Sequence, residues 1–131
     1  MKYMLTLFHD ESRWAHMSEE ETTADMARWD DYTNQLIAAG ALVSGEGLQP
    51  SATSGTLRIE SGERIVTDGP FAETKEQLGG FYVIDVETFD DALEWASKLP
   101  SMEYCSTEIR PVILYEDTGA EDTQRQVEAQ S

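Results

Sequence analysis

Short apolar runs alternate with longer segments of mixed polarity along this chain, and the two patterns predict strands and helices in turn. Residues 2–8 form a mostly apolar run rich in strand formers, which predicts a first strand. Ser18 then precedes Glu21 by three residues, a pattern typical of a helix start. Inward-facing residues follow at three- and four-residue spacing: Met26, Trp29, Thr33, Leu36 and Ile37. We expect a helix that ends at about Ala39, with Gly40 as its left-handed cap.

The remaining pattern predicts five more strands and a second helix. The expected strands are residues 41–45, 57–59, 64–66, 81–86 and 107–114. The strands on either side of Ser61-Gly62 have the signature of a hairpin. Thr88 can cap the second helix, which must end before Pro100, and Phe89, Ala92, Leu93 and Ala96 share one of its faces. The order predicts an α+β fold, a ferredoxin-like βαββαβ domain with a hairpin insertion and both helices on one face of an antiparallel sheet.

A sheet covered on one side leaves its other face open. We expect Tyr82, Ile84 and Val112 to project from that open face. An exposed apolar sheet face favours pairing with a second copy of the chain, so a homodimer is predicted.

Composition narrows the classes of partner. The 131 residues suit one domain, and nine Lys and Arg against 26 Asp and Glu give a net charge of −17. Such a field repels phosphate backbones and anionic lipids, so direct binding to nucleic acid or membrane is not expected. The single Cys105 and the lack of zinc-type Cys/His spacing predict no metal, and no other cofactor is predicted.

The ends of the chain carry two further expectations. The early acidic residues after the first strand and the absence of long apolar runs predict a cytoplasmic protein. Residues 116–131 contain five carboxylates and one large aliphatic residue, so we expect a folded domain over 1–115 and a disordered acidic tail over 116–131.

Candidate chemistry is concentrated in the segment 68–82. Asp68 begins a tight Asp-Gly-Pro turn, and Glu73 and Lys75 place both signs of charge beside it. One interpretation is an elaborate turn with no further role. The other is an acid/base or anion-binding edge, because a carboxylate fixed beside a lysine can have its pKa tuned and accept a proton.

Two more residues are candidates for ligand binding. Arg110 shares a strand face with Glu108, either as rim charges at a dimer seam or as a fork of donors for a small carboxylate. His9 ends the first strand, where a cleft could open, although a solvated loop histidine is the simpler interpretation.

The segment 68–80, Asp-Gly-Pro-Phe-Ala-Glu-Thr-Lys-Glu-Gln-Leu-Gly-Gly, resembles the signature of the DGPF branch of the YCII-related proteins. Flanking stretches extend the resemblance over residues 1–115: 40–43, 47–50, 91–96 and 108–112. The resemblance implies a dimeric α+β barrel. In other YCII-related proteins a histidine on the first helix and an aspartate form an acid/base pair, but no histidine lies between Ser18 and Ala39 here, so the pair does not transfer.

Two functions therefore remain open. The first is a small cofactor-independent enzyme, an isomerase or lyase, in which Asp68 moves a proton and Lys75 or Arg110 holds a small organic anion, with Glu73 and His9 nearby. The second is a ligand-binding or accessory module without turnover. The resemblance connects this second function to extracytoplasmic-function sigma factors, beside which relatives are often encoded.

Overall fold

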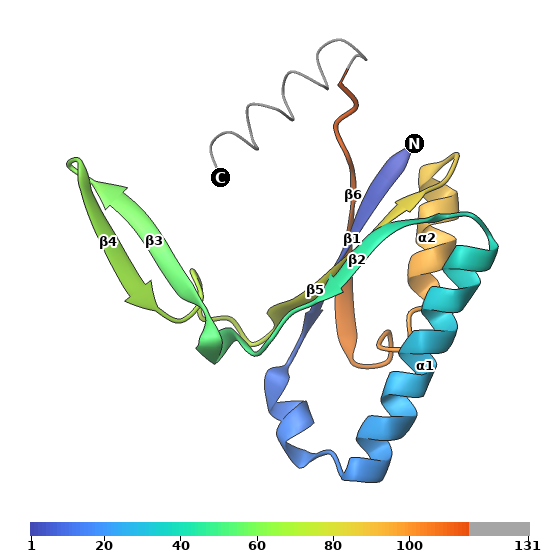
Figure 1. Ribbon diagram of the computed structural model, residues 1–131, viewed down its shortest axis with the longest axis horizontal. Coiled ribbons are helices and arrows are strands. Elements are labelled where there is room, and N and C mark those ends of the chain that lie inside the picture. Colours follow the sequence, from blue (N-terminus) through green and yellow to red (C-terminus); the bar gives the residue numbers. More distant parts are fainter. Residues whose placement is uncertain (116–131) are drawn as a thin grey trace.

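A four-stranded antiparallel sheet with two helices on one face forms the body of the protein in the computed structural model, which describes residues 1–115 (Figure 1). Across the sheet the strands are β2 (Leu42–Gly47), β5 (Gln77–Asp85), β1 (Lys2–His9) and β6 (Cys105–Pro111). The covering helices are α1 (Glu19–Ala38) and α2 (Phe89–Ser97). The mixed α+β class expected from the sequence is confirmed. The expected tail, 116–131, lies outside the described residues.

Local signals in the sequence place the helix ends. The Ser18 side chain accepts a hydrogen bond from the backbone N–H of Glu21 at 3.1 Å, and Gly40 has a φ of 69° immediately after α1. At the start of α2, Thr88 and Asp91 exchange side-chain and backbone hydrogen bonds in a capping box. These contacts satisfy backbone N–H groups that a helix start otherwise leaves unpaired.

The core lies between the sheet and the helices. Every second residue of β1 points toward the helices: Tyr3, Leu5 and Leu7 lie in the core, and His9 follows at its end. Tyr32 and Leu36 come from α1, and Ala92 and Ala96 from α2. The inward stripe of α1 is narrower than the sequence suggests, because Met26 and Ile37 are 63% and 57% exposed.

The expectation for the open sheet face is wrong for Tyr82 and Ile84. In the antiparallel register of β1 and β5, Tyr82 lies opposite Leu5 and Ile84 opposite Tyr3, and residues directly opposite one another share a face. Both side chains therefore point toward the helices, and Ile84 is fully buried. The other face takes the alternate residues of the two strands: Met4, Thr6, Phe8, Phe81 and Val83.

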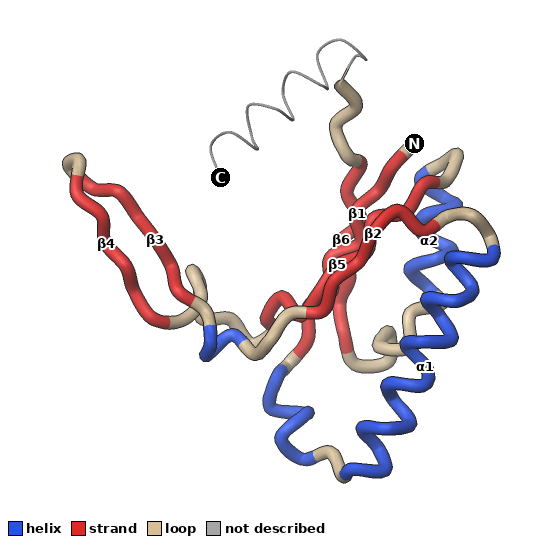
Figure 2. The backbone as a smooth tube through the Cα atoms, in the orientation of Figure 1, coloured by secondary structure: helices blue, strands red, loops and turns tan. Residues whose placement is uncertain are grey.

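A hairpin stands apart from this body. It consists of β3 (Gly55–Glu60) and β4 (Glu63–Asp68), joined through Ser61 and Gly62, which both have positive φ as a tight two-residue turn requires. Figure 2 shows the pair extending away from the sheet. Its place in the chain, between the second and third strands of the sheet, is the one that the sequence predicted for a hairpin insertion. No helix within residues 1–115 is long and apolar enough to cross a membrane.

Neighbouring residues of α1 give a test of this core. Leu36→Ala removes a fully buried side chain and should lower the free energy of unfolding by about 2–5 kcal/mol, through lost burial and the cavity left behind. Ile37→Ala removes an exposed side chain and should cost about 0.5 kcal/mol or less. Urea denaturation of the two variants checks this, and equal losses would contradict the orientation of α1.

Candidate functional site

A cavity of about 670 Å³ opens at one end of the sheet. Its walls are α1, the 3₁₀ helix η1 (Glu11–His16), and the adjoining ends of β1, β2, β5 and β6. Figure 2 shows η1 and the start of α1 together at that end of the sheet. The volume lies within the range of small-molecule sites in proteins.

His9 is the side chain in this cavity with the most specific environment. It continues the inward row of β1 but lies beyond the apolar core, and only 4% of it is exposed. The indole of Trp14 from η1 packs on its ring, with centroids 4.1 Å apart and planes inclined by 38°. The Nε2 atom of His9 has no hydrogen-bond partner among residues 1–115. A buried polar atom without a partner is costly, so it points to a functional role.

A glycine makes the position of His9 possible. The register of β1 and β5 shifts between Leu7 and Phe8, so that Gly79 is the extra residue of a bulge beside His9. A Cβ atom on Gly79 would lie 1.8 Å from Cε1 of His9 and 2.5 Å from Nδ1, far closer than two non-bonded atoms can approach. Only a glycine can occupy this position while the ring lies where it does.

Burial sets the protonation state of His9. Desolvation lowers its pKa from the usual 6.5, because the charged imidazolium loses its hydration. The carboxylates of Glu11, Asp10 and Glu76 oppose this shift but do not outweigh it. The imidazole is therefore neutral at pH 7 and able to accept a proton.

The α1 wall adds polar groups opposite this histidine. Asp25 accepts a hydrogen bond from the Tyr104 hydroxyl at 3.2 Å, while the Arg13 guanidinium carbon lies 3.6 Å above the Tyr104 ring. Burial, followed by the Asp25 charge, raises the pKa of Tyr104. About two turns further along α1, Thr33 shares a 2.7 Å hydrogen bond with the Tyr82 hydroxyl.

The floor near β6 carries Ser101 and Cys105. Ser101 is 2% exposed and its Oγ has no hydrogen-bond partner among the described residues. Cys105 lies directly across from His9 in the sheet, and burial raises the pKa of its thiol. The thiol is therefore protonated at neutral pH and a poor nucleophile. The part of the chain that the structure describes gathers no group of three or more His, Cys, Asp or Glu that could hold a metal.

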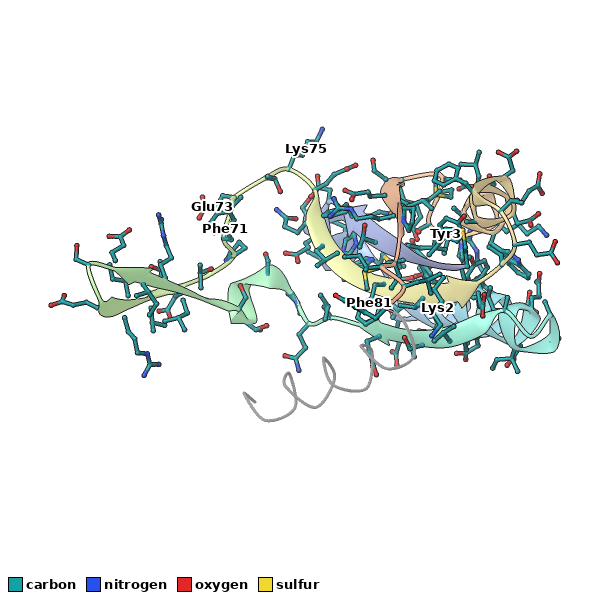
Figure 3. The ribbon with its side chains drawn as sticks, turned by 90° about the horizontal axis from the view of Figure 1, so that it is seen from above. Lys2, Tyr3, Phe71, Glu73, Lys75 and Phe81 are labelled. Carbon is teal, nitrogen blue, oxygen red and sulfur yellow. The ribbon has the colours of Figure 1, made fainter. Side chains whose placement is uncertain are left out.

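Of the five residues that the sequence predicted for catalysis or ligand binding, Asp68, Glu73, Lys75, Arg110 and His9, only His9 lines this cavity. Asp68 is an exposed residue at the end of β4, and Glu73 and Lys75 lie on the exposed link between the hairpin and the sheet (Figure 3). Arg110 lies opposite Met4 on the sheet face away from the helices and is ion-paired with Glu108. The roles assigned to these residues from the sequence remain predictions.

Sequence reasoning missed most of the cavity wall. Thr22, Asp25, Met26, Trp29, Asp30 and Thr33 line it from α1 at helical spacing. Trp29, expected on the inward face of the first helix, packs on the core and also lines the cavity. The consecutive glycines Gly79 and Gly80 were the feature of the sequence that could have indicated the cavity. A Cβ atom at Gly80 would lie 2.8 Å from the Glu46 carbonyl oxygen, so both glycines allow other groups to approach the backbone closely.

Comparison with known proteins now identifies the family. The sequence model of one protein family, the YCII-related domain, matches residues 1–116 of this chain. The chain belongs to the YCII-related family. An uncharacterised protein of Rhizobium meliloti (strain 1021) is 41% identical over 117 residues, which cover 88% of this chain and 94% of that protein. The YCII-related match spans every element described above, so the cavity lies inside the family domain.

The contact between His9 and Gly79 gives a test with a matched control. Gly79→Ala forces the imidazole or the bulge to move and should lower the free energy of unfolding by about 1–3 kcal/mol. Gly47→Ala, also in the cavity wall, adds a methyl group into open space and should change it by about 0.5 kcal/mol or less. Chemical denaturation measures both, and a neutral Gly79→Ala would contradict the packing of His9.

Proposed function

We propose that this YCII-related protein is a small cofactor-independent enzyme that uses His9 as an acid/base group on a small organic molecule held in the cavity. The observation that carries the proposal is the buried imidazole, with an unpartnered Nε2, at the edge of a cavity large enough for a substrate. A neutral histidine can take a proton at neutral pH, which is the requirement for a general base.

The surrounding groups suit proton transfer. His9 accepts a proton from a substrate carbon at Nε2 and returns it elsewhere on the same molecule in an isomerisation, or releases it after a leaving group departs in an elimination. Ser101 supplies an unpartnered hydroxyl group that can donate to a developing oxyanion. A substrate that fills the cavity would displace water from around His9, which strengthens each of these interactions.

The finer sequence expectations belong to the same proposal. They are membership of the DGPF branch, a ferredoxin-like topology in a dimeric α+β barrel and a cytoplasmic location. The strand order β2-β5-β1-β6 with antiparallel neighbours supports the topology. An organic anion, the ligand class suggested from the sequence, would need Lys75 or Arg110, and neither lines this cavity in its own chain.

A second candidate is a binding module without turnover, linked to an extracytoplasmic-function sigma factor. The observation that favours it is the exposure of Asp68 at the base of the hairpin. The hydrogen bonds that hold this turn are made by the backbone of the next residue, Gly69. There the N–H of Gly69 donates to the Ser54 carbonyl and the Thr56 hydroxyl donates to the Gly69 carbonyl. An exposed carboxylate in such a turn lacks the burial that tunes catalytic acids.

The base can be tested with nitrobenzisoxazole, a neutral aromatic compound whose ring opens, with a colour change, once a base removes one proton. The full-length protein should accelerate the reaction over buffer, and His9→Gln should lower the rate by about 10²-fold. His16→Gln, which alters the exposed histidine of η1, is the matched control and should leave the rate unchanged.

The pH profile follows from the lowered pKa of His9. Since the neutral form is the base, the rate should rise as pH increases through a pKa below 6.5 and be level at pH 7. Equal rates for the wild-type protein and His9→Gln would refute the enzyme and leave the binding module.

The oligomeric state is a separate prediction. The hairpin exposes Leu57, Ile59 and Val66, and Phe71 in the following link is 82% exposed, so a large apolar area is uncovered in one chain. Burying it against a second copy should give a dimer of about twice 14.7 kDa in sedimentation equilibrium at micromolar concentration. A species of 14.7 kDa would contradict the dimer.

A further inference from the structure

The charged groups that line the His9 cavity all have one sign. They are Asp25, Asp30 and Glu46, and within residues 1–115 no lysine or arginine lines it. Arg13 and Lys75 are nearby cations, but neither is part of the lining, and the Arg13 guanidinium is stacked on the Tyr104 ring. Neutral His9 does not balance these carboxylates.

Aromatic rings form much of the remaining wall. Trp14, Trp29, Tyr82 and Tyr104 all line the cavity. Trp29 and Tyr82 are nearly parallel, with centroids 6.4 Å apart and planes inclined by 14°. The faces of such rings attract cations, most strongly where water is excluded.

An independent observation at the same cavity points to a ligand. The Nε2 atom of His9 has no hydrogen-bond partner among the described residues, and only 4% of His9 is exposed. His9 lines the same cavity as the carboxylates. A ligand group that donates a hydrogen bond to Nε2 would satisfy this atom. An ammonium group carries such donors. A carboxylate could pair only with the tautomer that carries the proton on Nε2, and it would then lie among the carboxylates of Asp25, Asp30 and Glu46.

We infer that the cavity takes a small organic cation, an amine attached to an apolar or aromatic body, and discriminates against organic anions. The apolar body lies among the aromatic side chains, and the ammonium group faces Asp25 and Asp30 on α1. The net charge of −17 acts in the same direction, since it steers cations toward the protein and anions away. This inference rests on the proposed function, because it assigns a ligand class to the same cavity.

Tryptamine and indoleacetate test the inference because they share one ring system and carry opposite charges. Titration calorimetry with the full-length protein at low ionic strength should give tryptamine an affinity about tenfold or more above that of indoleacetate. Equal affinities, tighter binding of indoleacetate, or no binding of either compound would overturn the inference.

Two adjacent aspartates allow binding in the cavity to be distinguished from attraction by the overall negative charge of the protein. Asp30 lines the cavity, while Asp31 does not and accepts a hydrogen bond from Gln35 at 3.0 Å. Asp30→Asn should weaken tryptamine binding by about threefold to fivefold, and Asp31→Asn, which changes the net charge equally, by less than about twofold. Equal effects of the two variants would show non-specific attraction and overturn the inference.

Failure of the inference and failure of the proposed enzyme give different results. Nitrobenzisoxazole is uncharged, so its His9-dependent ring opening does not depend on the charge preference of the cavity. A preference for indoleacetate together with His9-dependent ring opening would overturn the cation inference alone. Tight tryptamine binding together with equal ring-opening rates in the wild-type protein and His9→Gln would overturn the enzyme alone.

Discussion

The candidate site depends on one close approach, that of the His9 imidazole to the backbone of Gly79. Without a side chain at Gly79, the ring fits against the bulge of β5 and is covered on one face by Trp14. This packing buries a titratable group at the end of the core row of β1 and lowers its pKa. The same bulge shifts the register at the end of the sheet, where the cavity opens.

The two faces of the sheet have different chemistry as a result. The helix-covered face carries the apolar core and continues into the cavity, where His9 meets the acidic and aromatic wall supplied by α1. The other face carries Arg110, paired with Glu108, beside the alternate residues of β1. Proton transfer is therefore proposed on the first face, and association with a second copy on the second face and the projecting hairpin.

Local patterns in the sequence predicted the elements well, because caps and hairpin turns are encoded by neighbouring residues such as Ser18, Thr88 and Gly62. They could not predict the register of β5 on β1, which turns Tyr82 toward α1 and depends on residues far apart in the chain. The burial of His9 has the same origin, since Gly79, Trp14 and His9 come together only after folding. The residue types of the segment after Asp68 favoured a catalytic or ligand-binding role. These residues lie outside the cavity because of the direction in which the hairpin leaves the sheet, which the local sequence does not determine.

The most direct measurement is a pH titration of the two histidines in the full-length protein by nitrogen-edited NMR of their imidazole rings. Comparison with the spectrum of His16→Gln assigns the two rings. We expect the pKa of His9 to lie below the usual 6.5, because burial removes the hydration of the charged imidazolium, and we expect the ring to be neutral at pH 7. A His9 pKa at or above 6.5 would contradict the burial on which the proposed base, and the cavity built around it, depend.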